Sequence, residues 1–322
     1  MLIRQTQRRA TMTDVARHAG VAQSTASAVL NGKSGKYAVT PVKAAAVLRA
    51  AEELGFEPNH AARTLVTGRS RVIALQIYDL ENPFQQQVAR RLWALLGEDD
   101  YMLIVYEVQS DSGRLRSSAD GAFVTAPGDM SAFTGKPVVQ LGSRATNPIG
   151  SVVVDLKSAA SEALAHLVAT GRRRIALIAH RDDSRVDSIA AAYSEAVASA
   201  GLPTIYIPVG EERANTGYEA LSGYLKGNDA PDAVLCRNDL LAFGCYKALA
   251  EAGLQVPSDV AVVGCDGIEI ADYLRPSLST IVQPVDDMCA VGWTHLKQML
   301  DDPTQVVKPV TLQARFVRRE SC

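Results

Sequence analysis

The residues best suited to binding another molecule lie within the first thirty positions. Amide and hydroxyl side chains occur there in a short segment with helical spacing. Gln23, Ser24 and Ser27 can each donate and accept hydrogen bonds, and Ala28 adds a small apolar group beside them. Side chains of these types near the start of a helix can contact base edges in the major groove of DNA. Residues 11–30 therefore predict a helix-turn-helix that binds DNA, with an ordinary helical hairpin as the alternative.

Local signals in the same segment indicate where the two helices begin and end. Thr11, with Asp14 three residues later, has the pattern of a capping box. Gly20 supplies a break, and an apolar stripe at helical spacing resumes over residues 25–30. Ala16 and Gly20 are small enough for the two helices to cross closely.

A third helix is predicted to cover the first two. Thr40 and Pro41 provide a cap and a first helical residue, and Gly55 provides the stop. Glu57 precedes a proline and is expected to be extended. Residues 59–65 can form a helix, but the stretch is too short to be stable alone.

The charge is distributed unevenly along the chain. Residues 1–70 carry 10 Lys and Arg against 4 Asp and Glu, whereas the remaining residues carry 23 against 31. A basic segment attached to an acidic body suits a module that binds a polyanion.

Length and composition indicate two or three compact units in a globular protein. The chain has 322 residues, of which 47% are apolar, and no apolar run reaches the length of a membrane helix. The first residues are basic and lack the apolar region of a secretory signal, so we expect a cytoplasmic protein.

The five cysteines do not predict a disulfide framework or a zinc site, because their number is odd and they include no CxxC pair. We expect four buried thiols, at positions 236, 245, 265 and 289, and an exposed thiol in the tail at Cys322. No metal and no cofactor are expected.

From residue 71 onward, short runs rich in β-branched residues alternate with helical patterns. The predicted helices span 158–169, 186–200, 238–252 and 285–300. This alternation predicts parallel, doubly wound α/β sheets with ligands at the carboxyl ends of the strands. About ten strands are too many for one small sheet, so we expect two subdomains that flank a cleft.

Sequence motifs do not favour an enzyme. The chain lacks Walker A, GxGxxG, GxSxG and HExxH motifs. The triplet at 180–182 matches part of a kinase catalytic loop without its companions, and the aspartate pairs fall where solvated loops and caps are expected. An enzyme and a periplasmic solute-binding protein remain the alternatives from other classes.

Eight phrases in this order resemble the LacI/GalR family of bacterial transcription regulators. They are TDVARHAGV, STASAVLNG, LRAAEELGFEPNHAARTL, IYDLENPF, GRRRIALI, PDAVLCRNDLLAFG, VPSDVAVVGCD and RPSLSTIVQP. The resemblance implies an all-α helix-turn-helix headpiece at 1–57, a hinge helix and linker at 58–70, and a body like the type I periplasmic binding proteins at 71–322. It also implies a homodimer that binds a palindromic operator and a small-molecule effector. The effector is expected to be a sugar or a related metabolite, and Arg144 and Arg237 leave an acidic metabolite open. A repressor is expected, with an activator or a corepressor-dependent regulator as the alternative.

The resemblance assigns DNA contacts to headpiece and hinge residues. Those expected to contact bases or phosphates are Thr13, Gln23, Ser24, Thr25, Ser27, Ala28, Asn31 and Thr40. Those expected in the minor groove are Asn59, His60, Ala62 and Leu65, with Leu65 as a wedge between base pairs.

Two departures from the family pattern predict an altered operator preference. Ala22 replaces the usual serine cap, which should cost the second helix about 1 kcal/mol. Ala28 replaces an arginine found in many relatives. The loop between the second and third helices is also longer than usual, and its Lys33 and Lys36 can contact the DNA backbone.

The resemblance places effector contacts at strand ends on both sides of the cleft. The expected residues are Asp79, Phe84, Gln85, Arg144, Ser158, Ile189, Arg237, Asn238 and Asp266. Ser158 and Ile189 stand where relatives carry a carboxylate and an arginine, so the effector itself is not determined. Asp239 is expected to cap a helix.

Two further expectations concern connections. Residues 98–121 are short for a full helix between two strands, so one crossover should be trimmed. The last residues follow soon after the final predicted strand and hold no heptad segment for assembly into a tetramer.

Overall fold

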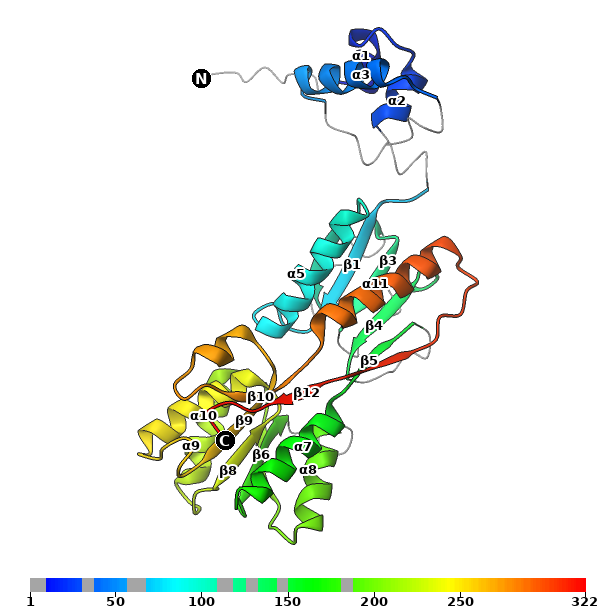
Figure 1. Cartoon of the computed structure of the whole chain (residues 1–322). Coiled ribbons are helices and arrows are strands. Elements are labelled where there is room, and N and C mark those ends of the chain that lie inside the picture. The colour runs from blue at the N-terminus through cyan, green and yellow to red at the C-terminus, as the bar shows by residue number, and fades with distance from the viewer. Residues whose placement is uncertain are drawn as a thin grey trace, which may run out of the picture. The chain divides into compact units, whose positions relative to one another are not determined.

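In a computed structural model the chain forms two compact units, residues 1–70 and 71–322 (Figure 1). The structure describes residues 10–30, 38–56, 68–108, 118–125, 133–143, 150–180 and 188–322. We call the first unit the headpiece and the second unit the body.

The headpiece contains three helices, α1 Met12–His18, α2 Gln23–Leu30 and α3 Pro41–Glu53. The predicted capping box at α1 is confirmed, because Asp14 N donates to Thr11 Oγ1 at 3.3 Å and Thr11 N donates to Asp14 Oδ2 at 3.0 Å. The Thr40 hydroxyl caps α3. Gly20 and Gly55 adopt φ of +65° and +57°, a conformation that favours glycine at a helix end.

Small apolar residues form the headpiece core. Val15 and Ala16 of α1 pack with Ala26 and Val29 of α2, and α3 adds Val47, Ala50 and Ala51. Alanines at these positions let three short helices approach closely, as the sequence predicted.

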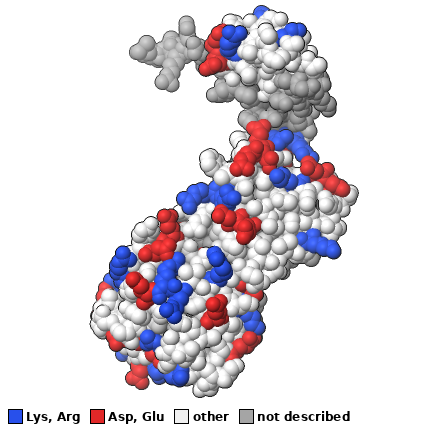
Figure 2. All heavy atoms as spheres, viewed as in Figure 1, with Lys and Arg blue, Asp and Glu red and all other residues white. Residues whose placement is uncertain are grey.

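The excess of positive charge in the headpiece lies mostly outside the described residues, at positions 4, 8, 9, 33, 36 and 63. On the face of the body seen in Figure 2, basic and acidic side chains are interspersed.

Six parallel strands form the sheet of one half of the body, which we call the N-subdomain. Their order is β11-β5-β4-β3-β1-β2. The strands are β1 Val72–Ile77, β2 Met102–Glu107, β3 Gly121–Val124, β4 Val138–Gly142, β5 Val152–Asp155 and β11 Val310–Gln313.

Six more strands form the sheet of the C-subdomain, in the order β12-β10-β9-β8-β6-β7. All neighbours are parallel except β12, which runs antiparallel to β10. The strands are β6 Ile175–His180, β7 Ile205–Val209, β8 Ala233–Cys236, β9 Ala261–Asp266, β10 Ser279–Val282 and β12 Arg315–Val317.

Helices cover the sheets as expected for a doubly wound fold, which confirms the predicted fold class (Figure 1). In the N-subdomain, α5 Pro83–Glu98 and α11 Val285–Asp301 pack against each other. In the C-subdomain, α7 Leu156–Ala169 pairs with α8 Ser188–Ser199, and α9 Ala214–Leu225 pairs with α10 Asp239–Glu251. A 3₁₀ helix, η3, spans Glu269–Tyr273.

The chain crosses between the subdomains three times, after β5, after β10 and between β11 and β12.

The predicted helices at 158–169, 186–200, 238–252 and 285–300 correspond to α7, α8, α10 and α11. The sequence did not predict α5 or α9. The C-terminal segment, expected to follow the last strand, instead supplies an edge strand to each sheet. In the connection expected to be trimmed, residues 109–117 lie outside the described part of the chain.

The four predicted buried thiols are buried, and all five cysteines are free. The prediction for Cys322 is wrong. Cys322 is half-buried against the apolar core, and this burial raises the pKa of its thiol. Among the described residues, no helix is both long enough and apolar enough to cross a membrane.

Glycines allow α9 and α10 to touch through their backbones. A Cβ atom on Gly244 would lie 2.0 Å from the carbonyl oxygen of Ala214, and one on Gly217 would lie 2.4 Å from the carbonyl oxygen of Leu241. Backbone atoms cannot swing aside as a flexible side chain can, so the helices must separate if either glycine gains a side chain.

We expect Gly244→Ala to lower the free energy of unfolding of the body by about 3 kcal/mol, because overpacking forces the backbones apart. Gly223→Ala is the matched control. It lies at an exposed position of α9 with no atom within 4 Å of the added Cβ, and should raise stability by roughly 0.5–1 kcal/mol. Urea unfolding followed by circular dichroism measures both. Equal midpoints for Gly244→Ala and the wild type would contradict the close crossing.

Candidate functional site

The headpiece presents a small polar surface at the start of α2. Gln23 and Ser24 are exposed, Thr25 and Ser27 are half-buried, and Thr13 and Thr40 are exposed on neighbouring segments. The Ala22 carbonyl accepts from Thr25 N at 2.9 Å, but its methyl side chain provides no cap.

One headpiece expectation is corrected. Ala28 was expected to face outward, yet it is only 4% exposed. It follows Ser24 by one helical turn, but its methyl group is too short to extend from the helix, and the residue is buried together with Ala26 and Val29. Five other expected DNA contacts lie outside the described residues, namely Asn31, Asn59, His60, Ala62 and Leu65.

The body contains a cleft of about 710 Å³ where the carboxyl ends of both sheets meet. The N-subdomain lines it with residues near or after the carboxyl ends of β1, β2, β3 and β4, and the C-subdomain with residues at or after those of β6, β7, β8, β9 and β10. The lining residues are Tyr78, Asp79, Phe84, Gln85, Glu107, Thr125, Gln140, Leu141, Gly142, Ser143, His180, Gly210, Glu211, Glu212, Arg213, Arg237, Asn238, Asp266 and Gln283.

Six expected effector residues line this cleft, namely Asp79, Phe84, Gln85, Arg237, Asn238 and Asp266. The structure does not place Ser158 or Ile189 among the described lining residues. Ile189 is the second residue of α8, and its side chain is fully buried in the apolar core. The Ser158 hydroxyl donates to the Asp155 carboxylate at 2.6 Å at the start of α7. Arg144 lies outside the described residues.

The loop after β1 is held rigidly by its own side chains. Asn82 caps α5 by accepting from Phe84 N at 2.9 Å, and its amide donates to Tyr78 Oη at 3.0 Å. Asp79 Oδ1 accepts from Glu81 N at 2.8 Å. The Thr125 hydroxyl donates to Gln85 at 2.6 Å. The N-subdomain wall of the cleft is therefore preorganised.

On the opposite wall, Asn238 rather than Asp239 caps α10. Asn238 Oδ1 accepts from Leu241 N at 2.8 Å, and its amide donates to the carbonyl of Glu212 at 3.0 Å. The expectation that Asp239 is a cap is therefore wrong. Asp239 is fully buried at the first position of α10 and accepts from Thr280 Oγ1 at 2.6 Å and from Gly267 N and Ile268 N, each at 2.9 Å.

Asp266 lies at the end of β9 in the left-handed region, with φ of +118°. A non-glycine residue in this region is strained, and such strain is typical of functional sites. Its side chain accepts from Gln283 Nε2 at 2.8 Å, and the residue is almost completely buried at the cleft wall.

Burial sets the protonation of both carboxyl groups. It raises the pKa of Asp239 to about 6, although the hydrogen bonds from Thr280, Ile268 and Gly267 lower it. Burial, followed by the negative charge of Asp239, raises the pKa of Asp266 well above its ordinary range, although Arg237 opposes this. A protonated carboxyl both donates and accepts hydrogen bonds, so Asp266 suits a ligand hydroxyl.

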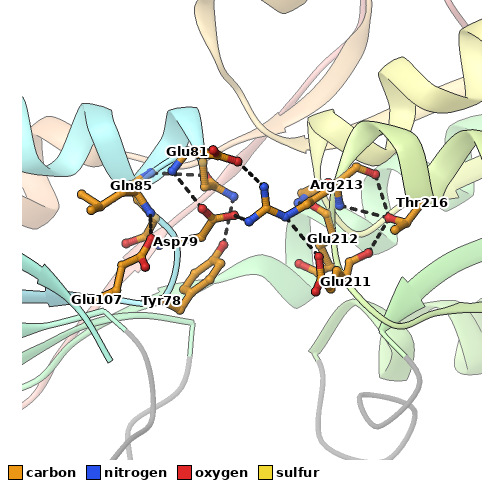
Figure 3. Close-up of polar contacts among 12 residues, drawn as sticks. Tyr78, Asp79, Glu81, Gln85, Glu107, Glu211, Glu212, Arg213 and Thr216 are labelled. Carbon is orange, nitrogen blue, oxygen red and sulfur yellow. Dashed lines mark hydrogen bonds and ion pairs between the residues drawn. The ribbon is translucent and has the colours of Figure 1, made fainter. Parts of the chain in front are cut away.

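Arg213 reaches across the cleft from the loop after β7 (Figure 3). Its guanidinium forms ion pairs with Asp79 Oδ2 at 3.1 Å, with Glu81, and with Glu211 Oε2 at 3.2 Å. Asp79 and Glu81 belong to the N-subdomain, whereas Glu211 belongs to the same loop as Arg213.

Comparison with known proteins identifies both units. Residues 11–59 match the family model for bacterial regulatory proteins of the lacI family, and residues 164–322 match that for a periplasmic binding protein-like domain. The ribose operon repressor of Escherichia coli K12 is 30% identical, over 97% of this chain and 99% of its own. The chain belongs to the LacI family of bacterial regulatory proteins. It is a DNA-binding transcriptional regulator.

Other LacI-family proteins are similar to this regulator over nearly its whole length. The transcriptional regulator CelR of Thermobifida fusca is 30% identical over 98% of both chains. A crystal structure of the lac repressor dimer bound to operator and an anti-inducer has a TM-score of 0.81 at 25% identity and covers 98% of this chain and 99% of that chain. A CelR–cellobiose complex has a TM-score of 0.69 at 26% identity, over 98% of this chain and all of that one.

Sequence reasoning missed several groups in the cleft of this regulator. Tyr78, Glu107, Thr125, Gln140, His180, Ser143, Glu211, Glu212, Arg213 and Gln283 all line it without having been predicted. Tyr78, Thr125, Ser143 and Gln283 directly follow a strand, and Glu107 and His180 each end one, so the rule that ligands bind at strand ends could have found these six. Arg213 had no such signal, because its partners on the opposite wall, Asp79 and Glu81, lie more than 130 positions earlier.

The raised pKa of Asp239 makes stability depend on pH in a defined direction. Its folded-state pKa of about 6 lies above the ordinary value of about 3.9, so the stabilisation is present below pH 4 and is lost as the pH rises through 6. Asp239→Asn should therefore gain free energy of unfolding relative to the wild type, by up to about 3 kcal/mol, as the pH rises from 4 to 7.

Guanidinium unfolding at a series of pH values measures this difference. Asp287→Asn, which replaces an exposed carboxylate on α11, is the control. A difference between Asp239→Asn and the wild type that stays constant from pH 4 to 7 would contradict the assignment.

Proposed function

We propose that this regulator is a repressor that binds a palindromic operator as a homodimer and is controlled by a neutral sugar in the cleft. The observation that carries the proposal is the match to the ribose operon repressor over both chains, together with a cleft lined by amide, hydroxyl and carboxyl groups. In this scheme the helix-turn-helix part of the headpiece, residues 1–57, binds operator. The hinge at 58–70 couples it to the body, and the body at 71–322 binds effector. Because its target is chromosomal DNA, the protein acts in the cytoplasm.

The polar start of α2 supports the DNA-binding role. The amide of Gln23 and the hydroxyl of Ser24 are exposed at the first two positions of the helix, where a recognition helix meets base edges. Thr13, Thr25, Ser27 and Thr40 supply hydroxyl groups suited to phosphates. The proposed minor-groove contacts are those of the hinge, with Leu65 as the wedge.

The chemistry of the cleft supports a neutral, hydroxyl-rich effector. Amide groups of Gln140, Asn238 and Gln283 and the carboxyl of Asp266 provide donors and acceptors for hydroxyls, and Phe84 provides an apolar surface. An acidic metabolite fits less well, because five carboxyl groups line the cleft and the Arg213 guanidinium is already paired with carboxylates.

The same chemistry makes a catalytic role for the body unnecessary. Binding in the cleft can shift the balance between two subdomain arrangements, and the effector acts only through its difference in affinity for them. We therefore propose a binding module and not an enzyme.

We expect Gln23→Ala combined with Ser24→Ala to weaken operator binding by about tenfold or more, because each base contact contributes roughly 1–3 kcal/mol. Binding to non-operator DNA should change little. Genomic fragments selected with the wild-type protein, followed by footprinting, provide the operator. Ser199→Ala, at an exposed position of α8, is the matched control. If no palindrome is protected with or without candidate sugars, the repressor proposal is abandoned.

We expect a neutral sugar to raise the Tm of the full chain, because a ligand at 100 times its Kd stabilises a protein by about 2.7 kcal/mol. The probes are D-ribose and cellobiose, with ribose 5-phosphate and gluconate as charged counterparts. Asp266→Ala should abolish any shift caused by a sugar. A shift with the charged probes alone would favour an acidic effector instead.

A further inference from the structure

Two ion pairs of Arg213, with Asp79 and Glu81, differ from ordinary surface ion pairs because they join the two subdomains. The exposure of the three side chains increases from the interior to the surface: Asp79 is 13% exposed, Arg213 38% and Glu81 78%. The guanidinium therefore lies at the rim of the cleft and links the wall formed after β1 to the wall formed after β7 (Figure 3).

Both ends of this link are anchored to their own subdomain. On the C-subdomain side, Arg213 N donates to Thr216 Oγ1 at 3.2 Å, and the Thr216 hydroxyl lies 2.9 Å from the Arg213 carbonyl oxygen. On the N-subdomain side, Leu80 N donates to Glu107 Oε1 at 2.8 Å, and Gln86 Nε2 donates to the Leu80 carbonyl at 2.9 Å. Because each loop is tied to its own subdomain, the ion pairs connect the two walls and not merely two separate loops.

The surrounding charges make Arg213 necessary for this arrangement. Asp79 and Glu81 on one wall face Glu211 on the other, and the guanidinium lies within ion-pair distance of all three. Without it, the carboxylates of Asp79 and Glu81 would face that of Glu211 across the rim and would lose the one cation that the described residues pair with all three. Like charges at this distance repel and would favour an open cleft.

We infer that Arg213 is a latch that holds the cleft closed by pairing with Asp79 and Glu81 of the opposite subdomain before any effector binds. The latch itself is a property of the body and is independent of DNA binding. Its consequence for effector affinity rests on the proposed function: an effector that binds the closed cleft gains from a closed state that is already populated.

The expected size of the effect is modest. Exposed ion pairs contribute little individually, but Asp79 is well shielded and two pairs cross the rim, so loss of Arg213 should change the closed population about three- to tenfold.

Hydrogen–deuterium exchange of the full-length, ligand-free protein tests the latch. In Arg213→Met, amides of residues 78–86, on the opposite wall, should exchange about three- to tenfold faster than in the wild type. A merely local disturbance of α9 would change exchange near residues 211–217 and leave 78–86 unaffected. Glu81→Gln provides the reciprocal test, with faster exchange expected at 211–217.

Arg91→Met is the matched control. Arg91 is also 38% exposed and pairs with Asp286 at 3.0 Å, but both residues lie within the N-subdomain. Arg91→Met should leave the exchange of both rim segments unchanged. About 1 M NaCl should speed exchange at 78–86 in the wild type and have little further effect in Arg213→Met, because salt screens exposed charges.

Unchanged exchange at 78–86 in Arg213→Met would overturn the latch, whatever the protein binds. Faster exchange together with failure to bind any operator would instead leave the latch intact and refute the proposed function.

Discussion

The cleft depends on one geometric constraint, that the carboxyl ends of two parallel sheets face each other. Three crossings between the subdomains hold the sheets in this relation. Because parallel strands all end at the same edge, residues at or after the ends of nine different strands converge on a single space. The strands form a rigid frame. The polar residues at their ends can change in type without disturbing the packing of either hydrophobic core.

Burial of carboxyl groups near these strand ends is a direct result of that geometry. Asp239 ties the first turn of α10 to the backbone after β9 and to Thr280 of β10. A Cβ at Gly264 would lie 2.1 Å from the Asp239 carboxylate, so that position must remain glycine for the carboxylate to fit. The neighbouring Asp266 then lies in the field of a buried negative charge, which favours its protonated form. The polar character of the C-subdomain wall thus depends on a residue that does not itself line the cleft.

Local signals were sufficient to predict much of the fold. The caps at Thr11 and Thr40 and the helices α7, α8, α10 and α11 are encoded in short stretches of sequence, and the structure has them where expected. The cap Asn82 and the first helical residue Pro83 also mark α5, so that helix was within reach of the same reasoning. By contrast, α9 contains two glycines and gains its stability from packing on α10, which no local pattern reveals.

The cleft was harder to predict, because its residues meet only after folding. Asp79 and Asn238 lie two residues after a strand and Asp266 is the last residue of β9, so their placement at strand ends was predictable. Ile189 was expected there from alignment with a family arginine, but an isoleucine on the inner face of α8 packs into the core. Arg213 acquires its role from Asp79 and Glu81, which are distant in sequence, so its function could not be read from its neighbours.

The late position of β11 and β12 in the chain limits how much of the body can fold during translation. Residues 310–317 complete both sheets, and α11 returns to cover a subdomain whose first strand lies more than two hundred positions earlier. Neither half of the body can reach its final structure until this segment has emerged, so folding must await nearly the whole polypeptide. A nascent chain of this kind exposes incomplete sheet edges for most of its translation, and is expected to need chaperone protection during that time.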